Sequence, residues 1–360
     1  MRKNIYSVIT GSGRCIPEKI KRNEDFLGND FYDASITQID KTNEEIIQKF
    51  SEITGIKERR YLEDNQVNSD IGFLAGLAAI KDAGINKEEL DYIIVAHNFG
   101  DIKINNPQID TIPSISSKIK NKLAVQNSDT VAYDILFGCP GWIQGIIQSN
   151  YYIKSGDAKK VLVIGTDALS RVSDPNDRDG MIYSDGAGAV VIEGRESEQP
   201  IGVISHKTKS DALDEAYYMW MGPSYGPKNS GKDLYLKMNG RKVFEYAMKK
   251  VPQLVKDTLE KAELPIEEVK KVLIHQANEK MDYGMLQRLF KLYGKKDIPA
   301  HIMPMTIAEL GNNSVATVPV LYNLLMEGHF EGEKPKSGEH IIFVSVGAGM
   351  NINCVVYKFP

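Results

Sequence analysis

The stretch YDILFGCPGWIQG, residues 133–145, joins a strand-like run to an amphipathic run through a cysteine that lies between two glycines. Gly138 and Gly141 permit a tight turn. Pro140 suits the first turn of a helix, because its missing N–H group is not needed there. The stretch therefore predicts a strand, a sharp turn that carries Cys139, and a helix.

The same alternation continues on both sides of this stretch. Short apolar runs rich in β-branched residues predict strands, and runs with helical apolar spacing that end at glycine predict helices. The predicted strands are 92–98, 130–136, 160–167, 188–194, 200–206, 271–277, 340–349 and 350–359. The predicted helices are 69–85, 141–156, 240–262 and 316–328. Such alternation indicates an α/β fold with largely buried sheets.

The two parts of the chain repeat one order of elements, although no short-period repeat is visible. The boundary falls in GRESEQP, so we expect an N-terminal half over 1–195 and a C-terminal half over 196–360. Residues 207–237 are polar, with one aromatic cluster, and we expect them outside the core layers. Pro252 predicts a kink in its helix.

Composition restricts the class of protein. The 360 residues are 42% hydrophobic and 26% charged, which is typical of a globular protein with a substantial core. The net charge of −4 gives no general reason to expect a nucleic-acid partner. Three cysteines are too few for a disulfide framework and favour a reducing compartment. With no membrane-length apolar run and no signal-peptide pattern, we expect a cytoplasmic protein without a membrane span.

Cys139 is a candidate nucleophile because of its position. A helix N-terminus presents unpaired N–H groups and a partly positive dipole end, so we expect the pKa of this thiol to be lowered. The same N–H groups could hold the oxyanion of an acyl intermediate. Taken alone, the stretch fits a buried, inert cysteine equally well.

Two further turns carry polar side chains. His275, in VLIHQANEKM, follows a predicted strand, and Asn312 and Asn313, in ELGNNSVATVPV, precede a predicted helix. Each has an ordinary structural alternative, as a capped core histidine and as helix caps. Turns of this kind gather at one end of α/β sheets, so we expect these side chains to meet Cys139 in one buried chamber.

Several motifs together resemble the β-ketoacyl-ACP synthase III group of thiolase-fold condensing enzymes. They are FGCPGW, HQAN, GNNSVATVP, SGDAKKVLVIGTDALSRVSDPNDRDGMIYSDGAGAVV and GAGMNINCVV, and the resemblance runs from residue 4 to residue 358. It implies two similar halves, each with a five-stranded sheet, stacked as α-β-α-β-α. It also implies a homodimer that forms carbon–carbon bonds by Claisen-type condensation.

The resemblance assigns roles to individual residues. Cys139 matches the acylated nucleophile, and the N–H groups of Cys139 and Ala348 match the oxyanion hole. His275 and Asn312 match the pair that holds the thioester carbonyl of the second substrate. The remaining substrate-binding candidates are Asn278 of HQAN, the neighbouring Asn313, Arg178 and Ile112. No metal and no tightly bound cofactor is expected.

The chain departs from the family pattern at the expected substrate entrance. Lys49 and Ile53 occupy the places of a tryptophan and an arginine that clamp the adenine of CoA, whereas Arg178 matches a family arginine. Both acyl-CoA and acyl-ACP therefore remain candidate donors. Ile112 takes the place of an aromatic residue that the dimer partner contributes to the acyl pocket, so a different acyl chain is expected.

Basic residues suggest a surface for an acidic acyl carrier protein. The candidates are Arg241, Lys242, Lys249, Lys250 and Lys280. The alternative is an ordinary solvated helix face.

The N-terminal stretch and AHNFGDI are similar to a subgroup that builds dialkylresorcinol-type pigments from a 3-oxoacyl and an α,β-unsaturated thioester. Rival interpretations are a non-catalytic partner subunit and an acyltransferase that makes esters. A nucleotide-binding oxidoreductase is a weaker rival, because GSG at 11–13 lacks a third glycine and Pro17 stands where the helix should run. The six histidines show no metal-ligand spacing.

Overall fold

Five strands of the N-terminal part form the first sheet in the computed structural model, which describes residues 4–104, 106–227, 233–332 and 334–360. The sheet order is β1–β9–β8–β4–β7, with β9 antiparallel to its neighbours and β8, β4 and β7 parallel. The bounds are β1 Asn4–Cys15, β9 Asp185–Ser197, β8 Lys160–Ala168, β4 Tyr92–Ala96 and β7 Val131–Ile135. The carboxyl ends of the parallel strands therefore share one edge, where functional turns are expected.

Among the described residues the second sheet has four strands, so the expectation of five is wrong there. Its order is β10–β15–β14–β13, with β10 Gly202–Ser210, β15 Asn351–Lys358, β14 His340–Gly347 and β13 Val269–Ile274. Residues 301–304 lie where a fifth strand would pair, and the Val272 N–H donates to the Ile302 carbonyl at 2.8 Å. His301 has a φ of 58° and Pro304 has no N–H to donate, so a regular ladder does not form.

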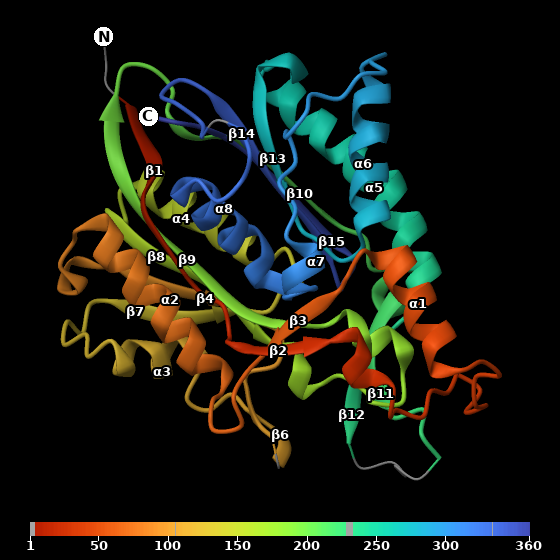
Figure 1. Ribbon diagram of the computed structural model, residues 1–360. Helices are drawn as coiled ribbons and strands as arrows, with labels where there is room; N and C mark the ends of the chain where they lie inside the picture. Colours follow the sequence, from red (N-terminus) through yellow and green to blue (C-terminus); the bar gives the residue numbers. More distant parts are fainter. Residues whose placement is uncertain (1–3, 105, 228–232, 333) are drawn as a thin grey trace.

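Helices complete the five expected layers (Figure 1). Helices α2 (Asn68–Ala83) and α3 (Ile115–Lys122) contact the first sheet. Helices α4 (Gly141–Ser155) and α8 (Thr317–Glu327) contact strands of both sheets, and α5 (Gly240–Lys261) contacts the second. Helix α6 (Glu279–Leu292) packs on α5. The expected α/β fold with an α-β-α-β-α arrangement is confirmed.

The middle layer forms the largest buried cluster of the described residues. Most side chains of α4 and α8 are buried, as expected for helices enclosed between two sheets. Trp142 of α4 is fully buried and meets Phe343 of β14 edge to face, with ring centroids 5.6 Å apart. This packing fixes the start of α4, and with it the turn at Cys139, between the two sheets.

The glycines of GSG have a packing explanation. A Cβ at Gly11 would lie 2.3 Å from the Ala83 nitrogen, and one at Gly13 would lie 2.5 Å from the Ala75 carbonyl oxygen. These glycines therefore let β1 lie directly against α2, and they belong to a strand rather than to a phosphate-binding turn.

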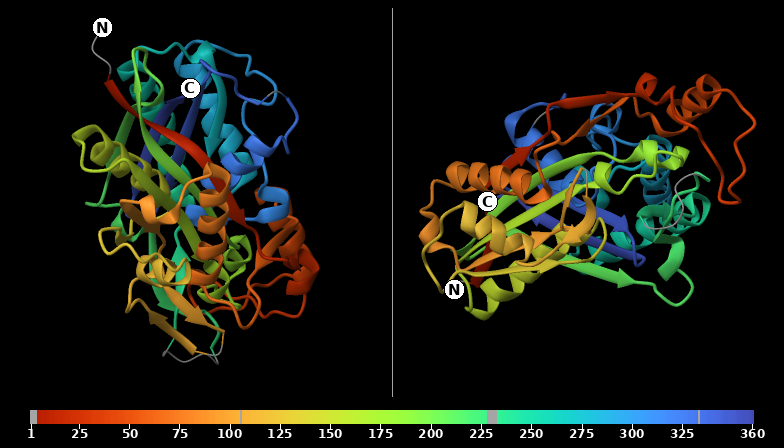
Figure 2. Two further views of the ribbon diagram at one scale, coloured as in Figure 1. Left: turned by 90° about the vertical axis from the view of Figure 1, so that its left-hand side faces the viewer. Right: turned by 90° about the horizontal axis from the view of Figure 1, so that it is seen from below.

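Two-stranded antiparallel sheets and two helices lie around the layers. The sheets are β2–β3 (Lys19–Arg22, Glu58–Tyr61), β5–β6 (Asp101–Lys103, Asn106–Asp110) and β11–β12 (Met219–Pro223, Leu234–Met238), and the helices are α1 (Asn43–Thr54) and α7 (Ile307–Leu310). The hairpin β11–β12 comes from the stretch expected outside the core. The start of β1 and the C-terminus lie at the opposite end of the molecule from it (Figure 1 and Figure 2).

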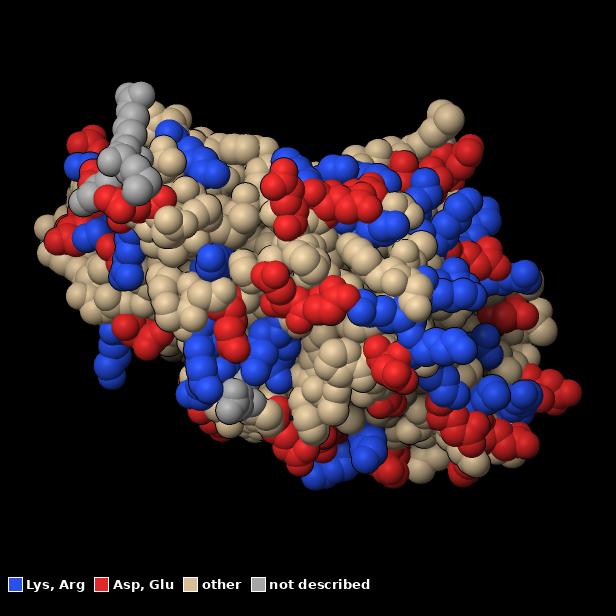
Figure 3. All heavy atoms as spheres, turned by 90° about the horizontal axis from the view of Figure 1, so that it is seen from above, with Lys and Arg blue, Asp and Glu red and all other residues tan. Residues whose placement is uncertain are grey.

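Most predicted elements coincide with observed ones within a few residues. Helix α5 continues from Gly240 to Lys261 with Pro252 inside it. No helix in the described part of the chain is long and apolar enough to cross a bilayer. On the face drawn in Figure 3, the described basic and acidic side chains are interspersed, so this face presents no surface of one sign.

Candidate active site

Cys139 lies in the turn between β7 and α4, as the opening stretch predicts. Gly138 has a φ of 64°, which favours glycine, and a Cβ there would lie 2.7 Å from the Ala348 carbonyl oxygen. Pro140 caps the helix, and the buried Asn353 side chain donates to its carbonyl at 3.2 Å. The turn is therefore held from the second half of the chain as well as from the first.

The segment after β14 approaches the same turn. A Cβ at Gly347 would lie 2.5 Å from the Cys139 backbone nitrogen, so only glycine fits. The next residue, Ala348, is held by the Asn351 side chain, which donates to its carbonyl at 3.0 Å. The backbone of Ala348 thus lies beside Cys139, as an oxyanion hole built from these two residues requires.

His275 directly follows β13 and is 3% exposed. Its backbone N–H donates to the Val344 carbonyl at 2.9 Å, which ties the residue to β14. The Nδ1 atom has no hydrogen-bond partner among the described residues. Burial lowers the pKa of His275 to about 4, and a backbone contact with Ser314 raises it slightly. The ring is therefore neutral near pH 7.

Asn312 is oriented by its own turn. Its side-chain Oδ1 accepts from the Ser314 N–H at 2.9 Å, which leaves the amide NH₂ group to donate to a ligand. Its backbone pairs with the segment that carries Tyr183, through the Asn312 N–H to the Ile182 carbonyl and the Ser184 N–H to the Asn312 carbonyl. The amide is therefore fixed in position before any substrate binds.

Ser314, Asn98 and Asp167 form a hydrogen-bond network that ends at the Cys139 sulfur. The Ser314 hydroxyl donates to the Cys139 sulfur at 3.5 Å. Asn98 Nδ2 lies 3.1 Å from that hydroxyl and 2.6 Å from Asp167 Oδ2. Asp167 is fully buried, and burial raises its pKa. The sequence analysis did not single out Asn98, Asp167 or Ser314, because only the fold brings β4, β8 and the turn before α8 together.

Burial opposes the expected lowering of the Cys139 pKa. Desolvation raises the pKa of this thiol to about 12, the hydrogen bond from Ser314 lowers it, and the Asp167 carboxylate raises it. The side chain therefore rests as a thiol at neutral pH, contrary to the expectation from the helix N-terminus alone.

Two cavities meet at Cys139. The larger has a volume of about 490 Å³ and carries Cys139, His275 and Asn312 on its walls. The smaller has a volume of about 210 Å³ and shares Cys139, Tyr183, Met219 and Asn312 with the larger one. The strands β11 and β12 supply much of its apolar lining. The expected convergence of the three side chains on one chamber is observed, and the sulfur lies at the junction of two spaces.

The other substrate-binding candidates occupy different places. Arg178 and Asn278 line the larger cavity, and Asn278 also accepts the Met281 N–H at the start of α6. Asn313 lines neither cavity: it is buried and its Oδ1 accepts from the Thr317 hydroxyl at 2.7 Å, so it does not fit the predicted substrate contact. Ile112 is 90% exposed outside both cavities.

The entrance departures also line the larger cavity. Lys49 and Ile53 of α1 lie on its wall together with Arg178. Arg241, Lys242, Lys249 and Lys280 are exposed on α5 and α6, close to the cavity residues Gly240, Val243, Phe244 and Met281. Arg241 forms an ion pair with Glu245 at 2.9 Å, and Lys250 pairs with Asp211 at 3.3 Å.

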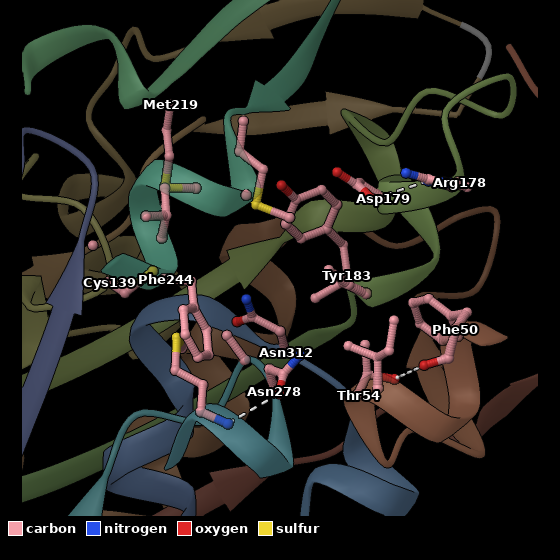
Figure 4. A pocket seen from close by; sticks show the side chains of 18 of the residues that line it. Phe50, Thr54, Cys139, Arg178, Asp179, Tyr183, Met219, Phe244, Asn278 and Asn312 are labelled. Carbon is pink, nitrogen blue, oxygen red and sulfur yellow. Dashed lines mark hydrogen bonds and ion pairs between the residues drawn. The ribbon is translucent and has the colours of Figure 1, made fainter. Parts of the chain in front are cut away.

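Figure 4 shows Arg178, Asp179 and Tyr183 on one segment beside the larger cavity. The sequence analysis missed Asp179 and Tyr183, although both stand in the motif that carries Arg178. No group of three or more His, Cys, Asp or Glu residues in the described ranges could hold a metal ion.

Known proteins match this chain over 98% of its length. A family model described as 3-oxoacyl-[acyl-carrier-protein (ACP)] synthase III matches residues 133–212, and the model of its C-terminal part matches residues 259–359. The β-ketoacyl-[acyl-carrier-protein] synthase III of Staphylococcus haemolyticus is 33% identical over 352 residues, 98% of each chain.

Solved structures agree with these matches. The 3-oxoacyl-[acyl-carrier-protein] synthase III of Aquifex aeolicus superimposes with a TM-score of 0.77 at 29% identity, over 98% of this chain and 100% of that one. The Thermus thermophilus enzyme gives a TM-score of 0.80 at 28% identity, over 98% and 99%.

Proposed function

The chain belongs to the 3-oxoacyl-[acyl-carrier-protein] synthase III family of condensing enzymes, and we propose that it joins two acyl thioesters through an acyl group held on Cys139. The observation that carries this proposal is the single cavity that places Cys139, His275 and Asn312 on its walls. The intact set also speaks against a non-catalytic partner subunit.

In the first stage, the Cys139 sulfur attacks the carbonyl carbon of an acyl thioester. The N–H groups of Cys139 and Ala348 hold the oxyanion, and the carrier thiol leaves with the proton that the cysteine loses. Burial raises the pKa of Cys139, and the Ser314 hydroxyl donates the hydrogen bond that stabilises the thiolate during the attack. The acyl chain extends into the smaller, apolar cavity.

In the second stage, a carrier-bound thioester enters through the larger cavity. The Asn312 amide and the neutral His275 ring hydrogen-bond its carbonyl oxygen and stabilise the enolate that forms when the C2 carboxylate leaves as CO₂ or when C2 loses a proton. The carbanion then attacks the acyl group on Cys139, which forms the carbon–carbon bond and releases the cysteine.

Product analysis of the purified protein tests this proposal. Incubation with an acyl donor and a carrier-bound malonyl or 3-oxoacyl group should give a product whose new bond survives alkaline hydrolysis. A product that alkali splits back into its two parts would instead support an ester-forming acyltransferase.

For the donor, we propose an acyl-ACP rather than acyl-CoA. The wall carries Lys49 and Ile53 where the family resemblance implies an adenine clamp, and α5 and α6, which supply other lining residues, carry exposed basic side chains. Those cations suit an acidic carrier protein. A turnover comparison with the same acyl group on CoA and on ACP tests this; equal or faster use of CoA contradicts it.

The finer proposal is that the enzyme joins a 3-oxoacyl thioester to an α,β-unsaturated one and closes a ring. It rests on the similarity of the N-terminal stretch and of AHNFGDI to the dialkylresorcinol-forming subgroup. A cyclohexanedione product supports it, whereas formation of simple 3-oxoacyl-ACP from malonyl-ACP contradicts it.

We also propose a homodimer. Strand β7 is an edge of the first sheet, and apolar Val131, Leu136 and Ile112 near it are 48%, 68% and 90% exposed. An exposed apolar edge strand favours pairing with a second copy, which would bring Ile112 toward the partner's acyl cavity. Analytical ultracentrifugation should give a dimer that Leu136→Lys weakens; a wild-type monomer would contradict the proposal.

A further inference from the structure

Asp167 is a buried carboxyl group to which the proposed chemistry gives no role. The residue belongs to β8 and is fully buried. Its Oδ1 accepts the Asn98 backbone N–H at 2.8 Å, and its Oδ2 accepts the Asn98 side-chain amide at 2.6 Å. Both of these donors are neutral groups. A buried carboxylate held by neutral donors takes up a proton more readily than one in water, because desolvation disfavours its charge.

Ser314 connects this carboxylate with the nucleophile. Its hydroxyl donates to the Cys139 sulfur at 3.5 Å. The Asn98 side chain that holds Asp167 also donates to the Ser314 oxygen, at 3.1 Å. The Ser314 hydroxyl hydrogen-bonds Asp167 as well, which lowers the pKa of that carboxyl. Because a hydroxyl has one hydrogen and rotates, Ser314 can donate to the carboxylate while its oxygen accepts the Cys139 S–H.

The backbone holds Ser314 in this position. Its N–H donates to the Asn312 side chain at 2.9 Å, and its φ of 53° lies in the left-handed region that serine adopts at a cost. Ser314 lines the smaller cavity together with Cys139, whereas Asp167 lines neither cavity. The hydroxyl therefore lies next to the reacting sulfur, and the carboxylate lies behind it, out of contact with the acyl donor.

The charges of Cys139 and Asp167 oppose each other. Burial is the main reason why the pKa of Cys139 is raised to about 12; the hydrogen bond from Ser314 lowers it, and the Asp167 carboxylate raises it. The ionisable groups that act on Asp167 include His97, which follows β4. A proton that moves from the sulfur to the carboxylate removes the repulsion between the two groups while the sulfur gains its negative charge.

Two other groups near the site are poorer acceptors for this proton. Burial lowers the pKa of His275 to about 4, and the proposed second stage uses its ring to hold a thioester carbonyl. Asp179 lines the larger cavity, but Figure 4 shows it next to Arg178, with which it forms an ion pair at 3.8 Å. Among these groups, Asp167 is joined to the sulfur by a single hydroxyl.

We propose that Asp167 accepts the proton of Cys139 through the Ser314 hydroxyl while the sulfur attacks the acyl thioester, and that it returns this proton to the leaving thiol by the same route. This inference rests on the proposed function, because it assigns the proton transfer of the first stage.

The hydrogens and electron pairs of this step balance. As the bond from the Cys139 sulfur to the carbonyl carbon forms, Ser314 passes its hydrogen to Asp167 and receives the S–H hydrogen, and the π pair of the carbonyl moves to the oxyanion. As the oxyanion collapses, the bond to the donor sulfur breaks. That sulfur takes a hydrogen from Ser314, which regains one from Asp167. Both sulfurs are bonded to one carbon in the intermediate, so the hydroxyl beside one lies close to the other.

The pH dependence of acylation tests the inference. Quenched-flow mass spectrometry follows the rate at which Cys139 gains an acyl group between pH 6.5 and 9.5. The probe is the fastest donor among acetyl-, octanoyl- and dodecanoyl-pantetheine.

Asp167→Asn keeps the size of the side chain and an oxygen that accepts hydrogen bonds, but it takes up no proton. It should acylate about 10²-fold more slowly than the wild type at pH 7, as loss of general-base assistance allows. This deficit should shrink about tenfold with each pH unit toward pH 9, because hydroxide then removes the proton instead.

Ser314→Ala should show the same pH-dependent deficit. The double variant should be no slower than Asp167→Asn, because both substitutions interrupt one route. Asp185→Asn is the matched control: this carboxyl group at the start of β9 is 1% exposed and accepts from Ser170 and Leu62. It should keep the pH dependence of the wild type.

A deficit of Asp167→Asn that is equal at every pH would overturn the inference, because loss of a structural contact gives that result. A pH-dependent deficit in Asp185→Asn, or additive effects in the double variant, would overturn it as well. If Asp167→Asn does not fold, Ser314→Ala decides, since a pH profile parallel to that of the wild type contradicts the route. All of these results leave the condensing function intact, whereas a wild-type Cys139 that none of the three donors acylates would contradict the proposed function.

Discussion

His97 and His275 stand at equivalent places in the two sheets. Each is the first residue after the fourth strand of its sheet, β4 in one and β13 in the other, and they are 1% and 3% exposed. By sequence position and burial alone, the two rings have the same opportunity to act in chemistry.

Their surroundings differ. His97 Nε2 lies 2.9 Å from Asp134 Oδ2, and its Nδ1 accepts the Gly100 N–H at 3.1 Å, so both ring nitrogens are used. The His275 ring has an unpartnered Nδ1 among the described residues and faces a cavity. The comparison teaches that His97 uses both ring nitrogens to hold the fold, whereas His275 lies on a cavity wall and leaves Nδ1 without a partner among the described residues.

The largest effect should come from replacing each histidine in turn. His275→Ala should lower condensation about 10²–10³-fold because one donor to the enolate is lost, with little change in melting temperature. His97→Ala should lower the melting temperature by several degrees because the Asp134 carboxylate loses one of its hydrogen-bond partners and the Gly100 N–H loses its acceptor. Steady-state kinetics and calorimetry on both variants give the answer. An unstable His275→Ala with normal specific activity would break the comparison.

The hydrogen bond that Ser314 of the second half donates to the Cys139 sulfur predicts the next largest effect. Ser314→Ala removes the hydroxyl that donates to the sulfur, so the pKa of Cys139 should rise further. Alkylation of Cys139 by iodoacetamide at pH 8, followed by peptide mass, should slow about tenfold. Asn98→Ala, which removes only the side chain that holds Ser314, should slow it less. If neither variant changes the rate of Cys139 alkylation at any pH, the hydrogen bonds through Ser314 and Asn98 do not stabilise the thiolate.

The loss of stability at acid pH tests whether His275 is buried as a neutral ring. Burial holds the pKa of His275 near 4 in the folded state against about 6.5 unfolded. The unfolded chain therefore binds the additional proton between these values, and stability present above pH 6.5 is lost as the pH falls toward 4. Between these pH values, the free energy of unfolding of His275→Gln should fall by on the order of 1–3 kcal/mol less than that of the wild type, as measured by denaturant unfolding. Equal acid losses in the two proteins would contradict the burial of a neutral ring.

The smallest expected effect concerns the entrance beside His275. Lys280 stands in the first turn of α6, next to cavity residues, and Lys291 stands in the last turn of the same helix. Lys280→Glu should raise KM for a carrier-bound thioester a few-fold at low salt, and less at high salt because exposed charges are screened. Lys291→Glu serves as the matched control and should leave KM unchanged. If both substitutions change KM equally, the carrier protein does not dock beside Lys280.

Local patterns explain which parts of the fold were predictable. Continuous apolar runs predict strands such as Lys160–Ala168, and the glycines and proline around Cys139 predict its turn. Strand β1 was not predicted because Gly11 and Gly13 interrupt its apolar pattern, and only α2 explains them. Residues 301–304 fail to form the fifth strand because of a local backbone conformation that composition does not reveal.

The features of the site also divide into those that the sequence predicts and those that it does not. Cys139, His275 and Asn312 each stand in a recognisable turn, so their convergence was predictable. The raised pKa of Cys139 was not, because desolvation depends on surroundings that only folding assembles. Tyr183 and Asn313 show the limit most clearly. Tyr183, to which the sequence analysis assigned no role, lines the cavity, whereas the side chain of Asn313 next to Asn312 accepts from Thr317 and lines neither cavity.

The mass of the protein after exposure to acyl thioesters tests the central claim most directly. Wild-type protein should gain one acyl group on the peptide that contains Cys139 and lose it when the second thioester is added. Asn312→Ala should gain the group and retain it, and Cys139→Ala should gain nothing. Acylation of Cys139→Ala to the wild-type extent, or discharge that does not depend on Asn312, would contradict the account.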